Sequence, residues 1–230
     1  MDFRNEWKYI CDEQTLQILQ KRLDHVMTKD PHCKDGPGYS IRSVYFDDYD
    51  NTGMMENEGG IDNRKKFRIR IYNCSEDRIR LEIKYKLRGY TKKESCFISK
   101  ELCDQILRGE KIAYDKTYAP PLQQLYVAMN CRLLHPVVIV EYERIPYVDN
   151  RGNVRITLDR NIGGSNNVTR LFDPMLPVCP AQRAGEHILE VKFDEILPEF
   201  YQNLWRDLNL QRVAFSKYYM CQIQMMKGRV

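Results

Sequence analysis

Charged and apolar residues alternate with a period of two along the stretch from residue 66 to residue 86. Every even-numbered position of 66–72 and 78–86 is charged or polar, and every odd-numbered position is apolar or aromatic. Side chains of a strand alternate between the two faces of a sheet, so this pattern predicts two strands, each with one apolar and one charged face. The same alternation recurs at 153–159 and at 188–194.

A charged face on one strand would be explained by exposure to solvent, as on an ordinary antiparallel sheet. Its recurrence favours a closed barrel instead, in which helices cover the apolar faces on the outside and the charged faces line the bore. Such a bore would be strongly cationic and would hold a few carboxylates. We interpret it as a container for a polyanion that is coordinated by a metal ion.

The remaining segments complete a mixed set of elements. Asp12 and Ser99 stand where helix N-caps are expected, and polar or Pro- and Gly-containing stretches predict connections at 29–38, 50–63 and 163–185. We therefore predict an α+β fold, a closed antiparallel β-barrel of about eight strands with helices packed outside. The further strands are predicted at 3–10, 39–47, 92–98 and 137–145, and the helices at 12–27, 99–108, 122–133, 200–208 and 213–226.

Composition narrows the class of protein. A chain of 230 residues, 43% of them hydrophobic, is typical of one barrel, so we expect a single domain over residues 1–230. The net charge of +4 is modest, and basic character must therefore come from clustering. Eight dispersed cysteines indicate reduced, mostly buried thiols, and the four histidines lack zinc-like spacing. With neither a leader pattern nor a long apolar run, we expect a cytoplasmic protein without a membrane segment.

Eight short motifs in one order resemble the VTC domain, the polyphosphate polymerase domain of the vacuolar transporter chaperone family. That family is a branch of the CYTH-like triphosphate tunnel metalloenzymes, and the resemblance runs from about residue 3 to about residue 220. The chain looks like the stand-alone prokaryotic version, without the sensing and membrane domains of the eukaryotic subunits. The motifs are Glu6-x-Lys8-Tyr9, Ser43-x-Tyr45-Phe46-Asp47, Phe67-Arg68-Ile69-Arg70-x-Tyr72, Glu82-x-Lys84, Tyr142-x-Arg144, Val154-Arg155-Ile156-Thr157-Leu158-Asp159, Leu189-Glu190-Val191-Lys192 and Phe215-Ser216-Lys217-Tyr218.

The resemblance implies a tunnel of antiparallel strands and transfer of the γ-phosphate of ATP to a growing polyphosphate chain, with Mn²⁺ or Mg²⁺ as cofactor. It implies that Glu190 binds the metal and that a further phosphate-binding lysine is Lys92 or Lys93, of which we favour Lys93. Arg68, Arg70, Lys84 and Glu190 are expected to act in the reaction itself. The other implied phosphate-binding residues are Lys8, Arg144, Arg155, Ser216 and Lys217.

The chemistry suits these residue types. Arginine binds phosphate oxygens with a planar fork, lysine adds point charge, and a carboxylate holds a hard divalent ion. Glu82 would either assist the metal or pair with neighbouring cations, and Tyr45, Tyr72 and Tyr142 would support the cations. Asp159 and Lys192 would balance charge within the tunnel.

Three functions remain open from the sequence: a polymerase acting on ATP and polyphosphate, a triphosphatase, or a module that only binds polyphosphate. In a triphosphatase, Glu6 or Glu190 would orient the attacking water. We do not expect nucleic-acid binding, because the cations alternate on strands instead of lying beside exposed aromatic platforms. The sequence identifies no protein partner.

Overall fold

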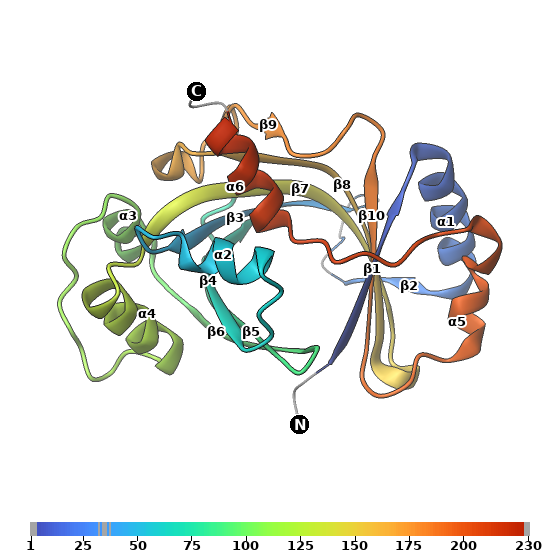
Figure 1. Cartoon of the computed structure of the whole chain (residues 1–230), viewed down its shortest axis with the longest axis horizontal. Helices are drawn as coiled ribbons and strands as arrows, with labels where there is room; N and C mark the ends of the chain where they lie inside the picture. The colour runs from blue at the N-terminus through green and yellow to red at the C-terminus, as the bar shows by residue number, and fades with distance from the viewer. Residues whose placement is uncertain (1–3, 32, 34–35, 37, 228–230) are drawn as a thin grey trace.

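The computed structural model describes residues 4–31, 33, 36 and 38–227, and its framework is one curled antiparallel sheet (Figure 1). Eight strands follow one path in the order β1-β10-β8-β7-β3-β4-β5-β6. Two short strands, β2 (Thr28–Lys29) and β9 (Cys179–Pro180), pair with β7 and β8. The eight are β1 (Asn5–Cys11), β3 (Tyr39–Asp47), β4 (Arg64–Tyr72), β5 (Arg80–Leu87), β6 (Tyr90–Phe97), β7 (His135–Asp149), β8 (Val154–Ser165) and β10 (His187–Phe193).

The two edges of this sheet approach each other at one end. Arg4 and Thr91 form an antiparallel bridge between the edges, with two backbone hydrogen bonds of 3.0 Å. Further along β1, the chain before the last helix takes the place of a neighbouring strand, since the backbone N–H of Val213 donates to the carbonyl of Lys8 at 2.8 Å. The predicted α+β class and antiparallel barrel sheet of about eight strands are confirmed, and the predicted closed barrel takes the form of a strongly curled half-barrel.

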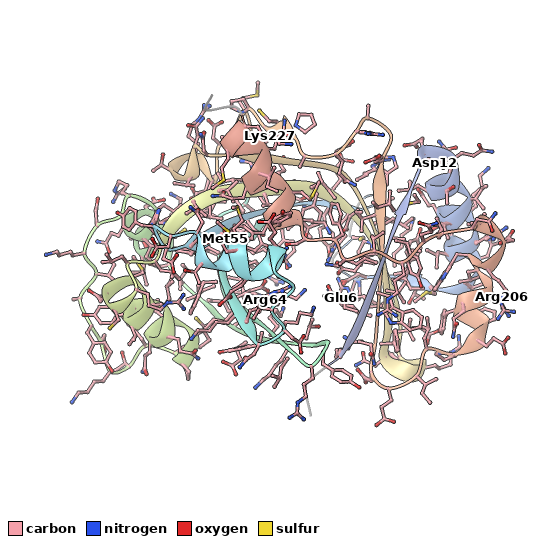
Figure 2. All side chains as sticks on the ribbon, viewed as in Figure 1. Glu6, Asp12, Met55, Arg64, Arg206 and Lys227 are labelled. Carbon is pink, nitrogen blue, oxygen red and sulfur yellow. The ribbon has the colours of Figure 1, made fainter. Side chains whose placement is uncertain are left out.

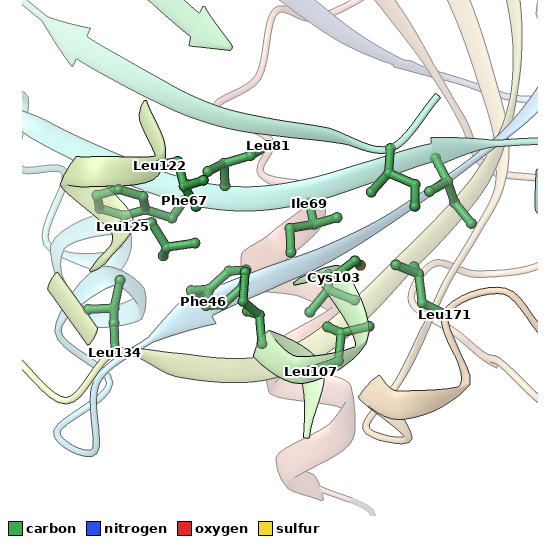
Figure 3. Packing of buried hydrophobic residues seen from close by; sticks show 14 of the residues in the cluster. Phe46, Phe67, Ile69, Leu81, Cys103, Leu107, Leu122, Leu125, Leu134 and Leu171 are labelled. Carbon is green, nitrogen blue, oxygen red and sulfur yellow. The ribbon is translucent and has the colours of Figure 1, made fainter. Parts of the chain in front are cut away.

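The outer face of the sheet carries the hydrophobic core. Odd-numbered residues of β4 and β5 pack against α3 (Lys100–Leu107) and α4 (Pro120–Cys131), and Figure 3 shows Phe67 and Leu81 beside Leu122 and Leu125. Across the molecule, α1 (Glu13–Val26) covers the outer face of β8 and β10 in a second cluster. Short α5 (Glu199–Asn203) joins that cluster through Tyr201. Burial of these apolar faces turns the charged faces inward.

The last helix, α6 (Lys217–Lys227), lies against the concave face. There Ile41 of β3 and Val138 and Val140 of β7 pack with Tyr218 and Cys221 of α6. Gly164 on β8 permits the close approach, because a Cβ at that position would lie 2.8 Å from the Cβ of Cys221. The prediction that helices pack outside the sheet therefore holds for α1, α3 and α4. Helix α6 instead lies on the concave face, at one end of the curl.

Most element boundaries agree with the sequence, and the differences have local causes. Asp12 and Ser99 cap α1 and α3 as expected, each accepting a backbone N–H three residues on. The connection over 50–63 contains a helix, α2 (Thr52–Glu58), and β8 continues to Ser165, into the expected loop. The last helix begins at Lys217 because the residues before it pair with β1.

All eight cysteines fall in the described part of the chain and are free thiols. Only Cys11, Cys103 and Cys221 are buried, and Cys131 and Cys179 are exposed, so the expectation of mostly buried thiols is wrong. Among the helices that can be described, none is long and apolar enough to cross a membrane. The predicted strand at 3–10 begins at a residue outside the described ones.

Candidate functional site

Basic side chains gather on the concave face around a few buried carboxylates. We call this set the inner cluster. Its acidic members are Glu6, Glu82, Asp159 and Glu190, and its basic members are Lys8, Arg68, Arg70, Lys84, Lys93, Arg144, Lys192 and Lys217.

The register of the sheet brings these residues together. Antiparallel pairing places Arg68 opposite Glu82, Lys8 opposite Glu190, and Arg144 opposite Asp159. Side chains directly opposite each other on one face lie close enough to interact, so charges of opposite sign pair across neighbouring strands. The inner cluster thus follows from the period-two pattern and the register.

Glu82 neutralises one group of cations. Its side chain is fully buried and accepts from Arg68 at 2.6 Å and from Lys93 at 2.9 Å, with Arg70 at 3.7 Å. Burial alone would raise the pKa of this carboxyl, but the three cations hold it well below its usual range. Of the two roles open for Glu82, the geometry is that of pairing with cations.

The alternative between Lys92 and Lys93 is decided by the strand's phase. Lys93 lies opposite Lys84 on β5 and donates to Glu82, whereas Lys92 pairs with Glu94. Lys93 therefore faces the inner cluster, as favoured from the sequence.

Asp159 organises a second group. The guanidinium of Arg144 donates to both of its oxygens, at 2.6 and 2.7 Å, and the ammonium of Lys217 lies 2.6 Å away. Burial would lower the pKa of Lys217, but Asp159 and Glu190 raise it above its ordinary value, so this lysine stays charged. The first residue of α6 is thereby fixed to the sheet.

Two further carboxylates, Glu6 and Glu190, share their lysine partners. Lys192 lies 2.6 Å from Glu190 and 3.5 Å from Glu6, and Lys8 lies 3.7 and 3.8 Å from the same two groups. Lys84 pairs with Glu6 at 2.7 Å. Burial would raise the pKa of each carboxyl, but the surrounding lysines lower it, and both are ionised at neutral pH.

Hydroxyl groups contact the two central arginines. Tyr45 accepts from Arg68 at 2.8 Å. Ser43 accepts from Arg70 at 3.2 Å, and the hydroxyl of Tyr142 lies 3.4 Å from the same guanidinium. These contacts agree with the predicted supporting role of Tyr45 and Tyr142, whereas Tyr72 packs edge-on against another tyrosine ring. Arginines held in this way are oriented before any ligand arrives.

Two predicted residues lie apart from the inner cluster. Arg155 pairs with Asp30 at 2.7 Å and donates to the hydroxyl of Tyr39, and no ion pair joins it to a carboxylate of the cluster among the residues described. Ser216 caps α6, since its hydroxyl accepts from the N–H of Tyr219 at 3.3 Å. The same hydroxyl lies 3.3 Å from the ammonium of Lys66. Lys66 was missing from the predicted set, although it has the same strand phase as Arg68 and Arg70.

The family model described as the VTC domain matches residues 3–226, nearly the whole chain. The chain belongs to the VTC domain family. No protein of curated function matches its sequence.

Some solved structures resemble the fold of this VTC domain. One, a protein of Bacillus halodurans proposed to be an adenylate cyclase, is 14% identical with a TM-score of 0.52, over 94% of this chain and 96% of that one. A Vibrio parahaemolyticus protein with the same proposed activity is 11% identical with a TM-score of 0.50, over 95% and 97% of the two chains. At these identities the likeness concerns the fold alone.

The donor set of this VTC domain fits a hard divalent ion only in part. Glu6 and Glu190 both pair with Lys192 and provide ionised carboxylate oxygens. Such oxygens are the ligands that Mn²⁺ and Mg²⁺ prefer. Among the described residues, no three His, Cys, Asp or Glu side chains gather in a way that could hold a metal. The carboxylates therefore fit an ion that completes its coordination with phosphate oxygens and water, as Mg²⁺ commonly does.

Proposed function

We propose that this VTC domain is a metal-dependent polyphosphate polymerase, which transfers the γ-phosphate of ATP to a growing polyphosphate chain inside the curl of the sheet. The observation that carries the proposal is the inner cluster, in which basic side chains outnumber carboxylates two to one on a concave face. Membership of the VTC domain family supports it.

The inner cluster can perform what phosphoryl transfer requires of a protein. The reaction depends mainly on holding the groups in line and on stabilising the charge of the transferring phosphoryl group. In this proposal Arg68, Arg70 and Arg144 bind phosphate oxygens with their planar forks, and lysines 8, 84, 93, 192 and 217 add positive charge. Phosphate oxygens would replace the carboxylates that these cations now contact.

The bond changes are simple. An oxygen of the terminal phosphate of the bound chain attacks the γ-phosphorus of ATP, the bond between that phosphorus and the bridging oxygen breaks, and ADP leaves with the electron pair. The nucleophile is already ionised at neutral pH, so no general base is needed. A divalent ion held by Glu190, with Glu6 beside it, would neutralise charge on the phosphates.

Hydrolysis is the second candidate, and the position of Glu6 favours it. The carboxylate of Glu6 is ionised and pairs with Lys8 and Lys192, which also pair with Glu190. It could therefore orient an attacking water molecule in place of the phosphate chain. The protein would then release phosphate from tripolyphosphate or a nucleoside triphosphate.

The experiment is to incubate the protein with γ-labelled ATP and Mn²⁺, with and without a short polyphosphate primer, and to separate the products by size. We expect labelled chains that lengthen with time. Arg70→Met and Glu190→Gln should lower the rate by about a hundredfold or more, because each removes charge stabilisation from the reacting group.

Outer-face variants on neighbouring strands serve as controls. Arg160 on β8 and Glu143 on β7 form an exposed ion pair at 2.8 Å, so Arg160→Gln and Glu143→Gln should keep the wild-type rate. Labelled free phosphate without chains would replace the polymerase by the triphosphatase. Tight binding of polyphosphate with no turnover would leave only a binding module.

A further inference from the structure

Lys66 differs from the basic residues of the inner cluster in having no carboxylate partner. It lies on β4 in phase with Arg68 and Arg70 and is half-buried. Its ammonium donates to the side-chain oxygen of Asn57 on α2 at 2.8 Å, lies 3.3 Å from the hydroxyl of Ser216, and stands 4.8 Å from the centre of the Tyr218 ring. In the described part of the chain, no ion pair to this lysine is formed, whereas every basic member of the inner cluster has a carboxylate within 4.0 Å.

The charged groups that face Lys66 are mostly cations. The cations that act on it most strongly are Arg64 of the same strand, Lys84 of β5 and Lys8 of β1. Asp47 of β3 is the carboxylate that acts on it, but its oxygens already accept from Tyr218 and from two backbone N–H groups at the start of α2.

The other charges of the covering helices point elsewhere. On α2, Glu56 acts on Arg64, and Glu58 acts on Tyr219. On α6, Lys217 is paired with Asp159. Figure 2 shows Met55 of α2 above Arg64 of β4. Glu6 of β1 is already paired with Lys84 at 2.7 Å. The surroundings of Lys66 therefore lack negative charge that is not already bound.

We propose that Lys66 is a further phosphate-binding residue, which joins the expected phosphate ligand Ser216 in one subsite and binds one phosphate group of the polyanion that occupies the inner cluster. This inference rests on the proposed function. A phosphate oxygen would replace the amide of Asn57 as the acceptor for Lys66, and the hydroxyl of Ser216, held as the cap of α6, would donate to the same group.

The subsite has a measurable consequence, because the surroundings of Lys66 disfavour its charged form. Burial lowers the pKa of Lys66, neighbouring cations lower it further, and the result is about 6. A bound phosphate favours the charged form and raises this pKa. Between the two pKa values the free protein lacks the proton and the complex holds it, so binding near pH 7 takes up a proton, whereas below about pH 6 it does not.

The test is calorimetric titration of the full chain with metal-free tripolyphosphate at pH 7.0, in buffers that differ in ionisation enthalpy. Wild type should take up nearly one proton more per bound ligand than Lys66→Met, and should bind about tenfold more tightly. Methionine resembles the uncharged lysine of the free protein, so this variant should fold. The matched control is Lys65→Met, since Lys65 is the exposed neighbour on the outer face and stands over Phe67.

Lys66→Arg separates charge from proton uptake, because arginine stays protonated when buried. It should bind tripolyphosphate but without the extra proton. Equal affinity and equal proton uptake in wild type and Lys66→Met would overturn the subsite while leaving the proposed function intact. Failure of the wild-type protein to bind tripolyphosphate at all would overturn both.

Discussion

At the scale of single residues, the inner cluster is a set of cations whose partners are internal carboxylates. Glu82 is the clearest case, because it is fully buried and touches three cations. Each such pair is favourable only while both members are present, since an unpaired buried charge is costly. A polyanion that enters the cluster therefore competes with the carboxylates for the same donors.

Glu82→Gln tests this competition. Removal of the negative charge leaves Arg68, Arg70 and Lys93 without their shared partner, so the free energy of unfolding should fall by about 3 to 5 kcal/mol. Tripolyphosphate should then raise the melting temperature of the variant more than that of wild type, because the ligand no longer displaces a carboxylate.

Glu94→Gln on the adjacent strand is the control. Glu94 pairs on the other face with Lys92 and with the hydroxyl of Tyr85, and its loss should cost at most about 1 kcal/mol. A ligand-induced shift in Glu82→Gln no larger than that of wild type would show that Glu82 and phosphate do not compete.

At the scale of elements, the sequence predicts best where one periodicity dominates. Strands β4 and β5 and their inward charges follow from the alternation at 66–86, and the caps at Asp12 and Ser99 mark the start of two helices. Helix α2 was missed because its segment is short and polar, and its start is stabilised by Asp47 of another element. The late start of α6 likewise depends on pairing with β1, which no local pattern reveals.

The contact between α6 and β8 offers a test of the helix position. Gly164→Ala would place a Cβ 2.8 Å from that of Cys221, so α6 or β8 must shift, at a cost of about 1 to 3 kcal/mol in the free energy of unfolding measured with urea. Gly59→Ala at the end of α2 meets only ordinary contacts, the nearest at 3.4 Å, and should stay within about 0.5 kcal/mol of wild type. Equal effects of the two substitutions would contradict the position of α6.

At the scale of the whole molecule, the curl of the sheet decides which predicted residues meet. The sequence motifs supplied most of the inner cluster, because phase fixes the face and antiparallel register fixes the neighbours. The sequence could not show that Arg155 pairs with Asp30, because that contact joins a strand to a loop far from it along the chain. Nor could it show that Lys66 meets Ser216, which depends on how α6 enters the curl.

The central claim is that phosphates bind on the concave face of the sheet, and the most direct measurement is a crystal structure of the protein with tripolyphosphate and Mn²⁺. We expect phosphate oxygens within hydrogen-bond distance of Arg68, Arg70 and Arg144, and an anomalous manganese peak beside Glu190. Tripolyphosphate bound on the outer face, or a manganese peak away from Glu190 and Glu6, would contradict the account.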